Sequence, residues 1–349
     1  MKKTILAVAI PALFAASAQA ATVYDADGVT AEVYGRMQFD ITDPGEKGKS
    51  DIDGVGSARM GFKAKSEIAP GIKALARGEW QIQAENSAKG SNFECEDVSD
   101  TSTCKVSSSD PFAARHLYAG FEFDEGGTVV FGQTDTAFYQ AVAATDIFNT
   151  YGYEAYDLIE DGRQEGQIVY NGEFGGFYVG ASYQFRDENF TVDLGNPNNG
   201  TSVTTNAKLD SGYAGTLGYA FDFGLAAYAG YHVEKFDAGE DKKNMALSAS
   251  YSWEDLYLAG AYVTTELGDA ELKGYDLVAS YDINAVSLYT GYAAQKAEGS
   301  ISDQGDTAKA FKLGAAYKFN SNMKAWAEYL NDGLEGADDQ WTIAVQYNF

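Results

Sequence analysis

The chain has 349 residues, with 51 Asp and Glu against 25 Lys and Arg, so its formal net charge is −26. An acidic excess of this size argues against nucleic acid as a partner, because phosphate backbones are bound by clustered Lys and Arg. The chain holds 24 Tyr, 20 Phe and 38 Gly but 5 Pro, and its mean hydropathy is −0.29. Such a composition is rich in strand formers without being strongly apolar.

The N-terminus has the form of a secretory signal peptide. The twenty residues MKKTILAVAIPALFAASAQA begin with two lysines, continue with an apolar stretch and end in an A-x-A cleavage pattern. The apolar stretch is too short for a spanning helix and Pro11 interrupts it, so an uncleaved anchor is the weaker alternative. We expect cleavage of residues 1–20, which lowers Lys+Arg from 25 to 23 and changes the net charge from −26 to −28.

Alternating polar and apolar side chains predict β-strands along the rest of the chain. In the first of them Met37, Phe39 and Ile41 alternate with Arg36 and Gln38. No later window holds an apolar run long enough to cross a bilayer as a helix. The segments with this alternation are 30–41, 56–69, 72–85, 111–123, 128–134, 163–174, 177–187, 210–221, 224–236, 244–253, 256–266, 271–283, 285–296, 308–319, 323–332 and 339–349.

The connectors between these segments distinguish a membrane barrel from a soluble sandwich, which the alternation alone does not. Brief turn sequences such as Gly175-Gly176 and Glu254-Asp255 alternate with connectors that are often long. Most segments reach the 9–11 residues of a tilted spanning strand, and closure satisfies every backbone amide within lipid. We therefore predict an all-β fold, a transmembrane antiparallel β-barrel of about 16 strands that forms one domain over residues 21–349.

Two segments, 111–123 and 256–266, alternate poorly. The sequence therefore leaves open which way Arg115 and His116 face. A contact with another subunit would explain mixed faces there.

The chain resembles the general bacterial porins, the sixteen-stranded trimeric diffusion channels of Gram-negative bacteria. The resemblance rests on ATVYDADGVTAEVYGRMQFD, SARMGFKAKSEI, ARHLYAGFEF, TVVFGQ before a long loop, and the closing WTIAVQYNF. It implies a homotrimer whose third external loop, here from about Thr134 to Asp161, folds inward and narrows the pore. The closing strand with its terminal Phe349 implies recognition by the barrel assembly machinery.

In that family, acids of the third loop face a ladder of basic residues on the wall. By position, the resemblance assigns the basic ladder to Arg36, Arg59, Arg77, Arg115 and Arg163. It assigns the loop acids to Asp146, Glu154, Asp157, Glu160 and Asp161. The family's Pro-Glu-Phe-Gly-Gly-Asp turn is replaced here by FNTYGYEAYD, and each arginine could instead be structural, paired with neighbours such as Glu79 or Glu165.

Cys95 and Cys104 are the two cysteines of the chain, and both fall in the polar connector between residues 86 and 110. Because a signal peptide sends the chain to an oxidising compartment, we expect a disulfide within this loop, with two free thiols as the alternative.

The sequence offers little for catalysis or metal binding. His116 and His232 are its two histidines, and neither stands in a recognisable hydrolase or metal-ligand pattern. We expect no enzymatic activity, cofactor or metal.

The leading hypothesis is an outer-membrane porin, a water-filled channel through which small hydrophilic solutes and ions diffuse, with a mild preference for cations. A substrate-specific channel is the alternative, and a barrel that anchors a surface adhesin or receptor is the third. We expect outer-membrane lipids and lipopolysaccharide as partners, with divalent ions bridging loop acids to lipid phosphates.

Overall fold

The computed structural model describes residues 20–43, 45, 52–83, 92–95, 104–107, 112–156, 163–194 and 202–349. Residues 1–19 of the predicted signal peptide lie outside these ranges. Within the described residues, no helix is long and apolar enough to span a membrane.

Nearly all regular structure in the described ranges is β-strand. The strands are β1 (Ala21–Ala26), β2 (Val29–Asp43), β3 (Asp53–Ala69), β4 (Ile72–Gln83), β5 (Asn92–Cys95), β6 (Cys104–Ser107), β7 (Phe112–Phe123), β8 (Gly127–Asp135), β9 (Arg163–Phe174), β10 (Phe177–Leu194), β11 (Val203–Ala220), β12 (Leu225–Phe236), β13 (Lys242–Trp253), β14 (Leu256–Leu267), β15 (Ala270–Ile283), β16 (Val286–Gly299), β17 (Asp306–Lys318), β18 (Met323–Asp332) and β19 (Gln340–Asn348). Three short 3-10 helices accompany them, η2 (Ala137–Ala141), η3 (Ala143–Thr145) and η5 (Ser302–Gln304).

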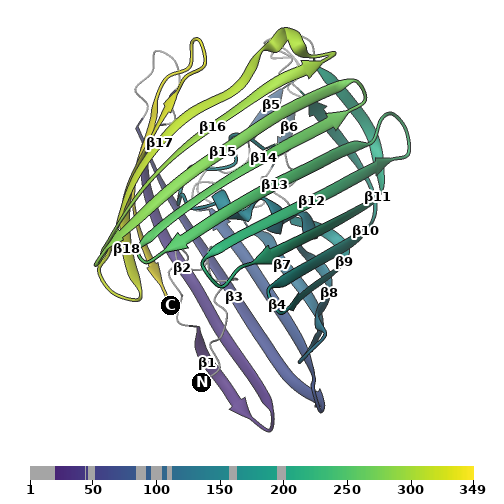
Figure 1. Cartoon of the computed structure of the whole chain (residues 1–349), viewed down its shortest axis with the longest axis vertical. Helices are drawn as coiled ribbons and strands as arrows, with labels where there is room; N and C mark the ends of the chain where they lie inside the picture. Colours follow the sequence, from purple (N-terminus) through teal and green to yellow (C-terminus); the bar gives the residue numbers. More distant parts are fainter. Residues whose placement is uncertain are drawn as a thin grey trace.

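The strands close into a barrel. Of the 17 strands in the main sheet, β1 pairs with the start of β2, and the remaining sixteen form an antiparallel ring that β19 and β2 complete. Figure 1 shows these strands as one continuous, tilted wall running from purple β2 to yellow β18. The β1–β2 hairpin turns at Asp27 and Gly28, whose φ angles of 55° and 76° suit an Asp-Gly turn of the hairpin type.

The alternation seen in the sequence separates the two faces of the wall. Along β19, Ile343 and Tyr347 are 53% and 50% exposed, whereas Thr342 and Gln346, which precede them, are buried. The outer face is thus apolar and exposed, and the inner face is polar.

Short turns define one rim of the barrel, and aromatic side chains gather beside them. The exposed aromatic residues next to these turns are Phe123, Phe174, Phe177, Phe221, Phe223, Trp253, Tyr281 and Phe319. A band of this kind lies at the lipid–water boundary of outer-membrane barrels, where the rings anchor the wall.

The predicted barrel of about sixteen strands is confirmed. The strand ends differ, because β10 reaches Leu194 and β11 begins at Val203, beyond the predicted 177–187 and 210–221. These extensions pair with one another at the rim opposite the short turns. Phe190, Val192 and Leu194 alternate with polar residues in the extension of β10 too, so the predicted end marked the length of a spanning strand and not the end of the pattern.

Candidate functional site

Side chains from opposite parts of the barrel meet around one cavity of about 710 Å3 in the lumen. One side consists of residues from β2, β3, β4, β7, β8, β9, β18 and β19, and the other is the segment that follows β8. The charged residues of the lining are Arg36, Arg59, Arg77, Arg115, Arg163, Lys324, Glu79, Asp135 and Asp146. The lining thus contains all five arginines that the sequence singled out.

A bulge explains how Arg115 reaches the cavity. On β7, His116 lies opposite Glu79 of β4 and Ala114 lies opposite Trp80, so Arg115 is an extra residue in the pairing. A β-bulge of this kind interrupts the alternation and lets two successive side chains share a face. Arg115 and His116 therefore both line the cavity, which the sequence pattern alone left open.

We call the five arginines that line the cavity, Arg36, Arg59, Arg77, Arg115 and Arg163, the arginine wall. Glu79 joins two of them, Arg77 and Arg115, through one carboxylate. It is 3.1 Å from Arg115 Nε and 2.6 Å from the terminal nitrogen of Arg77, and it accepts a hydrogen bond of 2.8 Å from the Tyr34 hydroxyl. Arg77 also donates to that hydroxyl at 2.9 Å. Two arginines thus share one buried acid, as the structural alternative for these residues anticipated.

Arg36 and Arg59 differ from that pair. They lie directly opposite each other on β2 and β3, and among the described residues they donate to the amide oxygens of Gln346 and Gln81, at 3.3 and 3.1 Å. Within the described ranges neither has a carboxylate at ion-pair distance. Two guanidinium groups thus stand side by side with neutral partners.

The segment after β8 covers the inner face of the opposite wall. Its short helices η2 and η3 are rich in alanine, and Phe138 and Val142 pack with Ala214, Ala246 and Val263 of the wall. Wall glycines permit the close approach, since a Cβ at Gly274 would lie 2.0 Å from the backbone oxygen of Ala155.

Glu328 on β18 holds residues 149–151, in the middle of this segment. Its carboxylate accepts the backbone N–H groups of Asn149, Thr150 and Tyr151 at 2.7, 2.9 and 3.2 Å, and the Tyr289 hydroxyl at 2.8 Å. A carboxylate that accepts several N–H groups is a strong anchor, because each bond is charge-assisted.

The predicted loop acids have different surroundings. Asp146 lines the cavity and accepts hydrogen bonds from the Tyr139 and Tyr153 hydroxyls at 3.0 and 2.7 Å. Burial, followed by the charge of Asp146, raises the pKa of both tyrosines, so both remain protonated donors. Glu154 instead lies 2.5 Å from the buried ammonium of Lys312 on β17. Asp157, Glu160 and Asp161 lie outside the described residues.

Sequence reasoning missed several residues of the cavity. Asp135, Tyr139, Tyr151, Tyr153 and Lys324 line it as well. The run FNTYGYEAYD did signal an unusual loop through its tyrosines, whereas nothing local marked Lys324, which reaches the loop at Asn149 Oδ1 over 2.5 Å.

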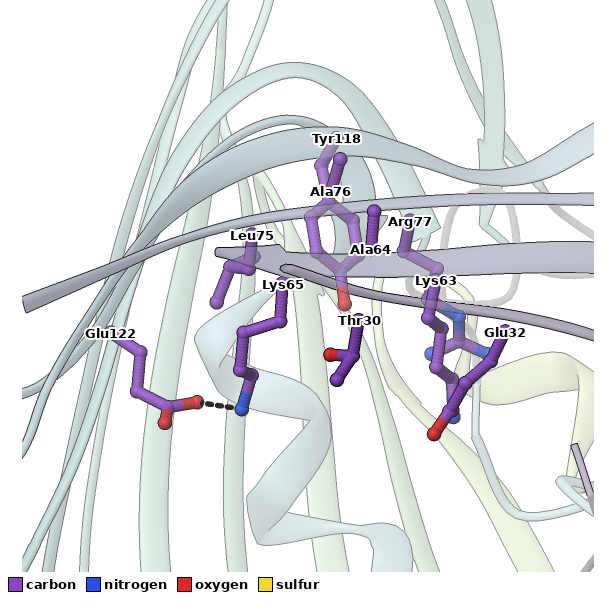
Figure 2. A pocket seen from close by; sticks show the side chains of 10 residues that line it. All are labelled: Thr30, Glu32, Lys63, Ala64, Lys65, Leu75, Ala76, Arg77, Tyr118 and Glu122. Carbon is purple, nitrogen blue, oxygen red and sulfur yellow. Dashed lines mark hydrogen bonds and ion pairs between the residues drawn. The ribbon is translucent and has the colours of Figure 1, made fainter. Parts of the chain in front are cut away.

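A second, smaller pocket of about 370 Å3 continues the charged wall along β2, β3, β4 and β7. Figure 2 shows Lys65 joined to Glu122, a contact of 2.5 Å, and Lys63 beside Arg77 and Glu32. Arg77 lines both pockets. Basic side chains therefore extend from the larger cavity along one side of the lumen.

The cysteines lie on a separate two-stranded hairpin. Its strands β5 and β6 pair antiparallel, with Cys95 opposite Cys104 in the register. This backbone pairing is compatible with the predicted disulfide, which stays a prediction.

Comparison with known proteins agrees with the barrel. A family model described as "Gram-negative porin" matches residues 6–337. The chain is 27% identical over 400 residues to outer membrane porin F of Salmonella typhi, with 100% of both chains covered. It is also 27% identical over 333 residues to the major outer membrane protein of Pasteurella multocida, covering 94% of this chain and 92% of that protein.

Solved structures show the same fold. A Salmonella typhi OmpF complex with daunomycin has a TM-score of 0.75 at 20% identity, covering 94% of this chain and 100% of that one. The trimer form of OmpT from Vibrio cholerae has a TM-score of 0.67 at 18% identity, covering 93% and 100%. The chain belongs to the Gram-negative porin family and is an outer-membrane channel for the passive diffusion of small hydrophilic solutes.

Proposed function

We propose that the 710 Å3 cavity is the constriction of this pore, that the pore mildly prefers cations, and that it works as a homotrimer without catalysis or cofactor. The observation that carries the constriction is the meeting of the arginine wall with the segment after β8 around one cavity. At such a place, the electric field of the charged side chains and the width of the pore act together on a solute.

Cysteine substitution tests the constriction. In a background lacking Cys95 and Cys104, Arg36→Cys and Arg59→Cys in membranes should react with a charged, water-soluble thiol reagent, and conductance should change. Met37→Cys and Met60→Cys are matched controls, because these neighbours are exposed on the outer face. Reaction at the methionine positions with protection at the arginine positions would reverse the proposed facing.

The preference for cations rests on the charge of the whole chain. Acids outnumber basic residues by 26, and those near the mouths concentrate cations there. The cavity lining opposes this, with six basic residues against three carboxylates. We expect the mouths to dominate for small ions in dilute salt, and the zero-current potential across a salt gradient measures the sign.

Replacing single acids separates the contributions. Asp146→Asn should shift that potential toward anions, because Asp146 faces the cavity, whereas Glu154→Gln should shift it less, because Lys312 already neutralises Glu154. Equal shifts would show that Glu154 also acts on the passing ion.

The assembly proposals rest on the relatives. One solved OmpT structure is a trimer form, so native mass measurement of the purified, detergent-solubilised protein should give three copies. We propose that export uses the predicted signal peptide, that assembly depends on the last strand up to Phe349, and that loop acids contact lipopolysaccharide through divalent ions. Deletion of Phe349 should lower the amount of folded barrel in the membrane. Chelation of divalent ions should release lipopolysaccharide without unfolding the barrel.

A further inference from the structure

On the loop side of the constriction, the described residues that line the cavity are mostly aromatic. Tyr139, Tyr151 and Tyr153 line the cavity beside Ile147 and Phe148. Among the described residues of this segment, Asp146 is the one carboxylate in the cavity lining, and two tyrosine hydroxyls already bond to it. A solute passing the narrow section therefore meets rings and hydroxyls on this side. We call Tyr139, Tyr151 and Tyr153 the tyrosine face.

The opposite side concentrates arginine. The chain has six arginines, and five of them line this cavity, whereas its lysines are spread along the sequence. Arginine offers a planar fork that matches a carboxylate with two parallel hydrogen bonds, which lysine does not.

Part of that wall lacks an anionic complement. Arg36 and Arg59 face each other with amide partners, and like charges directly opposite across strands are destabilising. The Arg36 Nε–H is buried and meets no acceptor among the residues that the structure describes. Lys324 adds a further positive charge to the same lining, and Glu79 is already shared by Arg77 and Arg115. A carboxylate that enters the cavity would supply what these groups lack.

The basic lining also continues beyond the cavity. In the neighbouring pocket the Lys63 ammonium lies 4.9 Å from the centre of the Tyr34 ring, next to Arg77 (Figure 2). An anion that leaves Arg77 thus meets another cation on the way along the wall, so its release does not require a single large step.

We propose that the constriction retains aromatic carboxylates as they permeate, with the carboxylate between Arg36 and Arg59 and the ring against the tyrosine face. A cavity of about 710 Å3 accommodates a single-ring acid with room for water. The inference rests on the proposal that this cavity is the constriction. Aromatic carboxylates are then the preferred solutes of the pore, whereas the preference among small ions is still set by the acidic residues at the openings of the pore.

The test is block of ionic current through the purified protein in planar bilayers. Benzoate, acetate, cyclohexanecarboxylate and benzylammonium are added to one side at constant potassium chloride. We expect benzoate to reach half-block at a concentration about tenfold below that of acetate, from ring contacts that acetate lacks. Cyclohexanecarboxylate should fall between them, and benzylammonium should not block.

Double variants separate the contribution of the arginines from that of the tyrosine face. Arg36→Gln with Arg59→Gln should remove most of the benzoate block, and Lys243→Gln with Lys309→Gln, an equal change of charge at exposed positions, should leave it intact. Tyr151→Leu with Tyr153→Leu should bring benzoate close to acetate, whereas Tyr151→Phe, which keeps the ring, should not.

The outcomes separate the two proposals. Conductance with equal block by benzoate and acetate, or block that survives the arginine double variant, would overturn the inference and leave the porin constriction standing. If the arginine double variant conducted and reacted to solutes like the parent in every respect, the cavity would not be the constriction, and both proposals would fail.

Discussion

At the scale of single residues, Glu79 determines how much positive charge the arginine wall presents. Its carboxylate is 5% exposed and bonds to Tyr34, Arg77 and Arg115 from three strands. A buried carboxylate with this many donors is stabilised by them, and the arginines depend on it in return, because guanidinium groups in a narrow lumen are only partly hydrated.

We predict that Glu79→Gln keeps the barrel but weakens it and makes the pore more favourable to anions. Arg77 and Arg115 retain an amide acceptor and lose the opposite charge, so the cost should be roughly 1–3 kcal/mol, reduced by the water that reaches both arginines. The unfolding midpoint and the zero-current potential measure the two effects. Glu67→Gln, an exposed acid on β3, is the control. If both variants gave the same potential as the parent, Glu79 would not contribute to the field in the pore.

At the scale of elements, the described part of the segment after β8 is held by contacts along its length. Alanine-rich turns pack on the inner wall, Tyr257 donates to the Ala144 carbonyl oxygen at 2.7 Å, and Glu328 accepts the backbone of residues 149–151. Packing positions the first part of the segment, Glu328 holds residues 149–151, and the ion pair of Glu154 with Lys312 follows them.

Replacing Glu328 should therefore loosen residues 149–151 more than the packed turns before them. In Glu328→Gln the side chain keeps its size, but charge-assisted bonds become neutral ones, and the amide adds a donor that faces backbone N–H groups. We expect larger and noisier single-channel conductance with an intact barrel, in comparison with Glu335→Gln at an exposed position. Unchanged current noise in Glu328→Gln would mean that packing alone suffices.

The predicted disulfide on the hairpin of β5 and β6 should contribute little to barrel assembly. Closing a loop of about ten residues stabilises by less than about 3 kcal/mol in the chain-entropy model, which is small beside a closed ladder of sixteen strands. The variant in which both Cys95 and Cys104 become Ser should assemble in the membrane to the parent's level, as judged by the amount of folded protein. Failure to assemble would show that the bond matters for folding.

The strands and the segment after β8 differ in how far the sequence predicts them. Period-two alternation and turn residues were sufficient for the sixteen strands, because lipid outside and water inside impose the same pattern on each. Arg115 was not predictable from alternation, since a bulge breaks the period at that point. The pairing of Glu154 with Lys312 joins residues 158 positions apart, and no local pattern encodes which strand lies across the lumen. The hairpin strands β5 and β6 and the leading strand β1 are too short to show a period.

At the scale of the whole molecule, the charges divide into two populations that salt affects differently. The chain carries −26 overall, whereas the lining of the 710 Å3 cavity has six basic residues and three carboxylates among the described residues. The acidic excess therefore lies outside this lining. Solvated charges are screened by salt much more than charges in a narrow, partly dehydrated lumen.

This division predicts how ion preference changes with salt. At about 0.1 M salt the Debye length is about 10 Å, so acids near the mouths still act on entering cations, and the pore should mildly prefer them. At about 1 M the length falls to about 3 Å, the mouths lose their influence, and the arginines that line the constriction act at contact distance. The cation-to-anion permeability ratio, measured from zero-current potentials at a fixed gradient ratio, should therefore fall as mean salt rises. The Arg36→Gln, Arg59→Gln double variant should show a smaller fall, because it lacks the opposing charges, while Lys243→Gln with Lys309→Gln should follow the parent. A pore that prefers anions in dilute salt, or a ratio that stays constant between the two salt levels, would mean that one population of charges controls permeation at every salt concentration.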